Sequence, residues 1–262
     1  MKRTLILLAA AVAVCSCSAG KYRKPNDSIR LLQFNVGSFG KYADSGIKTI
    51  ADIVRVLDAD VVSLNEVDSC NRRHNSDQAS DLAAELGAWD CTYGRAMAYR
   101  GGAYGNAVVS KSPLVSRRLI SLEKHNGSEA RSAAVAETEK FVFVATHLDY
   151  KDAESATRQA KQLSDSVKVW FADSGKPVFL AGDMNAEPGS PVIEALMQDW
   201  EQISCSEPTF PCPDAKKVID YIFVLKGGPE CKVLRSAVPY EVKGCNVDAA
   251  SDHYPIFVDV QF

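Results

Sequence analysis

The 262-residue sequence predicts one α/β domain over residues 29–262, in which mixed β-sheets are covered by helices. Strand-like and helix-like segments alternate to the end of the chain, and no linker between them is richer than a turn. Apolar residues make up 46% and charged residues 24% of the sequence, which is ordinary for a globular protein. In such folds, catalytic groups gather on the loops that leave the strand ends.

Short apolar runs predict the strands, and apolar residues spaced three or four apart predict the helices. Before residue 150 we expect strands at 29–36, 60–67, 91–97, 107–110, 132–136 and 141–148, with helices at 47–57 and 77–86. A helix over 154–173 carries on one face Ala156, Ala160, Leu163, Val167 and Trp170. The last predicted elements are a helix at 191–200 and strands at 177–181, 218–225, 232–236 and 256–262.

The beginning of the chain has the pattern of a secretory signal. Lys2 and Arg3 precede an unbroken apolar run from Leu5 to Val14, which is too short to span a bilayer as a helix. A buried first strand or helix is the alternative. The charges, the apolar run and the switch to polar residues at Lys21 favour a signal, so we expect export.

The end of this segment is similar to a bacterial lipoprotein signal, in which a cysteine after a small residue becomes acylated. Cys17 follows Ser16, whereas Cys15 follows the larger Val14. The resemblance implies a signal peptide over residues 1–17, a tether over residues 18–28, and membrane anchoring by lipid at Cys17. The protein would then face the periplasm or the cell exterior.

The charge balance argues against tight non-specific binding of nucleic acid. The formal net charge is −3, and it becomes −5 when the two charges of Lys2 and Arg3 are removed. A mildly acidic protein gains little attraction to phosphate backbones. A bound cation would change the local field, so nucleic acid stays possible but is not favoured.

Six cysteines follow Cys17, an even number that in an exported chain predicts up to three disulfides. The nearest pairs are Cys205 with Cys212 and Cys231 with Cys245, which leaves Cys70 with Cys91. Fifteen pairings are possible for six cysteines, so this pairing is one option among several. A zinc site is the rival interpretation, but no Cys-x-x-Cys occurs.

Several predicted strands border side chains suited to metal binding or proton transfer. The set comprises Asn35, Glu66, His147, Asp183, Asn185, Asp252 and His253. Each alone has an ordinary explanation as a turn, a helix cap or a solvated group. Together they offer hard oxygen ligands suited to Mg²⁺ or Mn²⁺, and histidines suited to proton transfer near neutral pH. The pattern therefore predicts metal-assisted hydrolysis of a phosphate ester.

Seven ordered segments resemble the endonuclease/exonuclease/phosphatase superfamily. They are residues 33–36, 64–67, 104–111, 146–149, 182–188, 219–223 and 251–255, and the likeness extends over residues 29–262. Asn65 departs from the more common Gln, and Lys111 from the common Arg. The resemblance implies a four-layer α-β-β-α sandwich, with two mixed sheets face to face and helices outside.

The resemblance also implies a role for each matching residue. Asn35, Glu66 and Asp252 would hold the metal ion, Mg²⁺ or Mn²⁺. The catalytic residues would be Asp183 acting on the attacking water, Asn185 holding the phosphate, His253 paired with Asp220, and His147 donating to the phosphate or the leaving group. Substrate contacts would come from Tyr104, Asn106, Arg131 and Thr209. Packing or a turn explains Tyr104 and Thr209 equally well.

We therefore expect a monomeric, metal-dependent phosphoesterase that cleaves a phosphodiester. A membrane-tethered enzyme meets lipid head groups readily, which favours a phospholipid head group or an inositol phosphate as substrate. An exported nuclease is the first alternative, and phosphomonoesters or small diesters are the next. An alternative of another class is a non-catalytic lipoprotein that binds a phosphate ligand.

Overall fold

The computed structural model describes residues 20–41, 46–126 and 129–262. The expected signal peptide, the acylated Cys17 and the first two tether residues lie outside the described part. No helix in the described ranges is long and apolar enough to cross a membrane.

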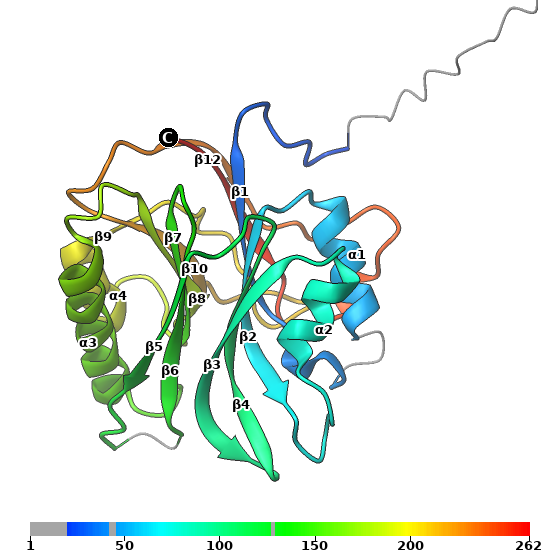
Figure 1. Cartoon of the computed structure of the whole chain (residues 1–262), viewed down its shortest axis with the longest axis horizontal. Coiled ribbons are helices and arrows are strands. Elements are labelled where there is room, and N and C mark those ends of the chain that lie inside the picture. The colour runs from blue at the N-terminus through cyan, green and yellow to red at the C-terminus, as the bar shows by residue number, and fades with distance from the viewer. Residues whose placement is uncertain (1–19, 42–45, 127–128) are drawn as a thin grey trace, which may run out of the picture.

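Two six-stranded mixed sheets pack face to face, and helices cover both outer faces (Figure 1). In spatial order the first sheet consists of β11 (Lys232–Ala237), β12 (Ile256–Gln261), β1 (Ile29–Asn35), β2 (Val61–Ser69), β4 (Gly102–Ser110) and β3 (Asp90–Tyr99). The second consists of β5 (Ser116–Leu122), β6 (Arg131–Glu137), β7 (Val142–His147), β8 (Val178–Asp183), β10 (Asp220–Leu225) and β9 (Trp200–Gln202). This is the predicted four-layer sandwich.

Each sheet is covered by two helices that bury an apolar stripe. The helices α1 (Ile47–Val56) and α2 (Gln78–Glu85) pack on the first sheet, and α3 (Ala153–Phe171) and α4 (Pro191–Asp199) pack on the second. The side chains of Asp77, Asp152 and Ser190 cap α2, α3 and α4 by accepting backbone N–H bonds. Two short 3₁₀ turns, η1 (Gly37–Phe39) and η2 (Val247–Ala249), lie in loops.

The strand register brings the predicted site residues to one end of both sheets. β1 and β2 run parallel, so Asn35 lies opposite Asn65. β7 and β8 also run parallel, which places His147 opposite Asp183. Because β10 is antiparallel to β8, Asp220 begins its strand beside the end of β8. The carboxyl ends of two parallel pairs thus meet across the sandwich.

Two strands escape the sequence prediction. β5 lies at the edge of the second sheet, and its first half, which carries two arginines, is exposed, so buried and exposed residues alternate only in its second half. β9 is only three residues long. The buried face of α3 includes Phe171 in place of the predicted Trp170, which packs on the core only partly.

The predicted disulfides are wrong, because all six described cysteines are free. The partners of Ser69 and Cys91 on β4 are Ala103 and Val109. These partners are six positions apart on β4 (103 to 109). At roughly 3.3 Å per residue, Cys70 and Cys91 are therefore roughly 20 Å apart along the sheet. A disulfide needs Cα atoms within about 7 Å.

The other two predicted cysteine pairs are not bonded either. Cys231 packs between the two sheets, whereas Cys245 packs on the helix-covered face of the first sheet. The Cys205 thiol contacts Glu207 at 3.5 Å, and the Cys212 thiol contacts the Asp248 carbonyl at 3.6 Å. The Cys205 and Cys212 thiols therefore contact oxygen atoms and not each other.

Candidate active site

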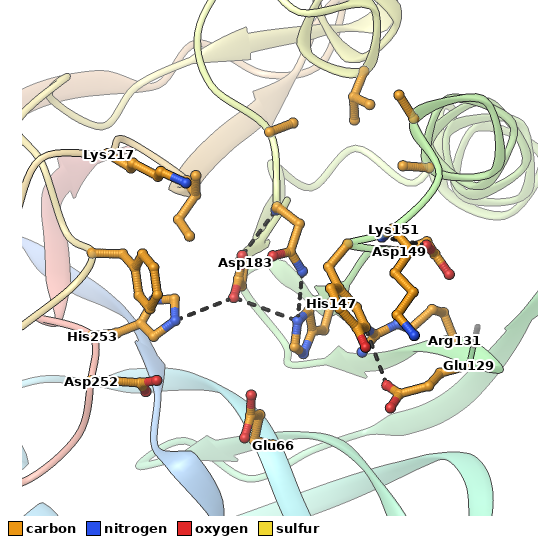
Figure 2. A pocket seen from close by; sticks show the side chains of 18 of the residues that line it. Glu66, Glu129, Arg131, His147, Asp149, Lys151, Asp183, Lys217, Asp252 and His253 are labelled. Atoms are coloured by element: carbon orange, nitrogen blue, oxygen red, sulfur yellow. Dashed lines mark hydrogen bonds and ion pairs between the residues drawn. The ribbon is translucent and has the colours of Figure 1, made fainter. Parts of the chain in front are cut away.

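A cleft of about 930 Å³ opens where these strand ends meet. Ten of its lining residues are labelled in Figure 2: Glu66, Glu129, Arg131, His147, Asp149, Lys151, Asp183, Lys217, Asp252 and His253. Asp183 lies at the centre, between the imidazoles of His253 and His147 (Figure 2).

His253 and Asp220 form a buried pair. The Asp220 Oδ2 atom accepts from His253 Nδ1 at 2.8 Å and from the Thr209 hydroxyl at 2.6 Å. Gln33 donates to Asp220 Oδ1 at 3.1 Å. Burial lowers the pKa of His253, but the negative charges of Asp220 and Asp183 outweigh it and raise that pKa to about 10. His253 is therefore an imidazolium at neutral pH.

Neighbouring groups shift the pKa of Asp183 in opposite directions. Its Oδ2 accepts from Asn35 Nδ2 at 3.1 Å and lies 3.6 Å from His253 Nε2 and 3.5 Å from His147 Nε2. Burial raises its pKa, the His253 charge lowers it, and Asp220 raises it again, with the result at about 7. A carboxyl with such a pKa is suited to proton transfer near neutral pH.

His147 differs from His253 in charge. Burial, followed by the nearby positive charges of Arg131 and His253, lowers its pKa well below the usual value. Its Nε2 lies 2.9 Å from Asn185 Nδ2, which donates to it, so the proton of the neutral ring is on Nδ1. That Nδ1 has no hydrogen-bond partner among the described residues. Asn185 itself has φ of 49°, a left-handed conformation that is strained for a residue other than glycine.

Glu66 and Asp252 lie together below Asp183 in the cleft (Figure 2). A register shift between Leu64 and Val67 places Glu66 at φ of 59° and turns its side chain out of the regular strand alternation. The Lys41 ammonium is 3.7 Å from Glu66 Oε2 and 4.0 Å from Asp252 Oδ2. Two carboxylates, one on β2 and one in the loop before β12, thus converge on one positive charge.

This pair fits a divalent cation. Its donors are hard oxygens, Asp252 Oδ1 is buried without a partner, and the lysine marks the place as favourable for positive charge. Ligand atoms of Asp183, Asp220 and His253 also lie within 4.8 Å of one another. However, Asp220 already accepts three hydrogen bonds, so we interpret it as the partner of His253. Asn35, predicted to bind metal, donates to Asp183.

The four predicted substrate contacts divide into two groups. Tyr104 and Arg131 line the cleft. Burial and the charge of Glu66 raise the pKa of the Tyr104 phenol, so it stays a donor. Asn106 and Thr209 are instead buried below the cleft: Asn106 donates to the Ser132 carbonyl at 2.9 Å, and Thr209 donates to Asp220. Neither side chain lines the cleft itself, although Thr209 contacts the partner of His253.

Several residues at the site escaped the sequence analysis. Gln33 and Asn65 form a buried amide chain in which Gln33 donates to Asn65 Oδ1 at 2.6 Å and Asp183 N donates to the same oxygen at 3.0 Å. The Phe210 ring lies 4.8 Å from the His253 ring and lines the cleft. Gln33 lies inside a matching segment, and Phe210 stands directly before Pro211, but neither position carried a chemical signal of its own.

A family model described as Endonuclease/Exonuclease/phosphatase family matches residues 32–253. The chain belongs to this family. Members are hydrolytic phosphoesterases that depend on divalent metal ions. The chain therefore has the family's phosphoesterase fold, and its centre combines carboxylates with two histidines.

Other known proteins are similar to this chain in sequence or in fold. The uncharacterized protein YbhP of Escherichia coli (strain K12) is 31% identical over 151 residues, which cover 52% of this chain and 57% of YbhP, so the match spans little more than half of the relative. A solved family member from Beutenbergia cavernae DSM 12333 has a TM-score of 0.71 and 23% identity, over 90% of this chain and 72% of that one. The mannosyl-6-phosphatase of Bacteroides thetaiotaomicron VPI-5482 has a TM-score of 0.73 and 18% identity, over 90% and 100%. The two structures support the fold.

Proposed function

We propose that this protein is a divalent-metal-dependent hydrolase of phosphate esters, with a small phosphodiester of the phospholipid-head-group or inositol-phosphate type as substrate. One observation carries the proposal. The Asp183 carboxylate lies between a cationic and a neutral imidazole and above a carboxylate pair suited to a cation. Separate protonation states of neighbouring groups are the usual mark of acid–base assignment.

The reaction assigns one task to each side chain. Asp183 takes a proton from a water molecule, whose oxygen attacks phosphorus as the bond to the ester oxygen breaks. Asn185 holds a phosphoryl oxygen, and the His253 imidazolium stabilises the negative charge that develops there. Neutral His147, whose Nε2 faces Asp183 and Asn185, would lie beside the phosphate or the leaving oxygen. Asp220 keeps His253 charged and oriented.

Glu66 and Asp252 would hold the cation, Mg²⁺ or Mn²⁺. When bound there, such an ion supplies charge neutralisation and polarises a phosphoryl oxygen. Hard oxygen donors support this choice over a thiolate metal, because the described cysteines lie outside the cleft.

The cleft lining supports a small polar substrate. Besides the proposed catalytic and metal-binding groups, it carries Arg131, Lys151 and Lys217 together with Glu129 and Glu187. Such a wall of mixed charge suits a head group better than acyl chains or a long polyanion. We also propose that the enzyme is exported as a monomer and anchored through Cys17, where it meets head groups readily.

The test is hydrolysis by the chain that follows Cys17, in Mg²⁺, in Mn²⁺ or in EDTA. The panel is bis-p-nitrophenyl phosphate, p-nitrophenyl phosphate, glycerophosphoinositol, phosphatidylinositol vesicles and plasmid DNA. We expect metal-dependent cleavage of the small diesters that EDTA abolishes. Cleavage of DNA alone would replace the substrate with nucleic acid. Failure on every ester, combined with binding of inorganic phosphate, would favour the non-catalytic binding protein.

A further inference from the structure

Beyond His147 the cleft continues into a region whose buried polar groups the proposed reaction does not use. Arg131, Asp149 and Lys151 lie together there, on the side of His147 away from His253, with Glu129 close by (Figure 2). These four residues are here named the Asp149 subsite.

Asp149 is held firmly and keeps one carboxylate oxygen without a partner. Its Oδ1 accepts from the backbone N–H groups of Lys151 at 2.8 Å and Asp152 at 3.0 Å. Its own N–H donates to Gln159 Oε1 at 3.0 Å. Asp149 is only 2% exposed, yet Oδ2 has no hydrogen-bond partner and no ion pair with another described residue. A buried acceptor left open in a fixed position indicates a donor from a ligand.

Arg131 supplies the complementary group. Its side chain is 3% exposed, and its Nη2 atom contacts Glu129 Oε2 at 3.3 Å. The guanidinium lies 5.8 Å from the centre of the Tyr150 ring, and the Nε atom has no partner among the described residues. The donor Arg131 Nε and the acceptor Asp149 Oδ2 are thus both buried and both without a partner among the described residues. Their side chains line the same part of the cleft.

We infer that the Asp149 subsite binds substrate hydroxyl groups, so that the substrate is a phosphate ester of a sugar or another polyol. A hydroxyl donates to Asp149 Oδ2 and a neighbouring hydroxyl accepts from Arg131, which pairs both open groups. The two carboxylates of the subsite balance its two cations, so it has no net positive charge to attract the further phosphates of a polynucleotide. The inference rests on the proposed function, since the hydroxyls must belong to the ester that is cleaved.

The experiment compares matched esters that differ in their hydroxyl groups. Glycerophosphoinositol is paired with the glycerophosphate diester of cyclohexanol, which keeps the ring and both alkyl ester bonds but has no ring hydroxyls. Inositol 1-phosphate is paired with cyclohexyl phosphate as the corresponding monoesters. The Asp149→Asn variant can keep the Oδ1 contacts while replacing the open acceptor with a donor. Asp165→Asn is the matched control, because it makes the same chemical change at an exposed position of α3 that pairs with Lys168 and does not line the cleft.

We expect the wild type to prefer each polyol ester, and Asp149→Asn to lower the ratio of kcat/KM for glycerophosphoinositol over its cyclohexyl counterpart by about 10- to 100-fold, as for a hydrogen bond to a charged group. Asp165→Asn should leave that ratio unchanged. Turnover of the cyclohexyl esters without a polyol preference in the wild type would overturn the inference and leave the proposed function standing, even if Asp149→Asn failed to fold. Turnover of no ester would contradict both the inference and the proposed function.

Discussion

At the scale of single residues, the two histidines of the site differ in charge because their neighbours differ. Both histidines lie near Asp183, but His253 also has Asp220 on Nδ1. His147 instead has the Asn185 amide on Nε2 and the Arg131 charge nearby. The sequence located both histidines, because each stands beside a strand end. It could not give their charges, since those depend on contacts between residues far apart in the chain.

The His253 pKa should be measurable in metal-free protein by NMR titration of the imidazoles. We expect His253 to stay protonated through pH 8, with a pKa near 10, and His147 to stay neutral at pH 6. Because the folded pKa of His253 is raised, its stabilising contribution is full below about pH 6.5 and is lost as pH rises towards 10. Asp220→Asn should lower the His253 pKa. An unchanged pKa in that variant would remove Asp220 from this role.

Metal affinity tests the second residue-scale feature. Glu66→Gln should weaken Mn²⁺ binding by at least about 10-fold, since it removes one of two converging carboxylates. Titration calorimetry on the variant and the wild type measures the change. Glu187→Gln alters a cleft carboxylate outside the pair and serves as the control. Equal affinities in all three proteins would exclude Glu66 as a ligand.

At the scale of elements, most of the fold could be predicted because its strands are buried apolar runs and its helices have clear apolar stripes. The misses have physical causes: β5 is an edge strand with exposed arginines, and β9 is too short to show a period. The bulge that turns Glu66 outward could not be predicted, since it depends on the pairing of β2 with β4. The direction of the Asn106 side chain also could not be predicted, since it faces the buried amide chain and not the cleft.

A buried ion pair joins two of these elements. Arg30 in β1 donates to both carboxylate oxygens of Asp259 in β12, at 2.7 and 2.8 Å, and both side chains are fully buried. Asp259→Ala should lower the free energy of unfolding by about 3–5 kcal/mol, because it leaves the arginine buried without its counter-charge. Urea denaturation measures this, with the exposed Lys48–Asp52 pair as a control whose loss has a much smaller effect. A loss as small as that of the control would contradict this account of the pair.

At the scale of the whole molecule, the fold holds together through three apolar clusters, two beneath the helices and one between the sheets. The even cysteine count suggested disulfides, but sequence spacing says nothing about which face of a sheet a cysteine occupies. A domain with cores of this size needs no covalent cross-links. The chain after Cys17 should therefore show six reactive free thiols when it is unfolded without reductant. Thiol titration with a chromogenic disulfide counts them, and a count near zero would restore the disulfides.

The central claim is that Asp183 and His253 carry out the hydrolysis. The most direct measurement is kcat for bis-p-nitrophenyl phosphate with Mn²⁺, in the wild type, Asp183→Asn, His253→Ala and the control His125→Ala, whose imidazole contacts Glu154 outside the cleft. We predict losses of about 10²- to 10⁴-fold in the first two variants, with unchanged circular dichroism, because Asp183→Asn removes the proton acceptor and His253→Ala removes the group that stabilises negative charge. Near-normal turnover in either folded variant would contradict the account.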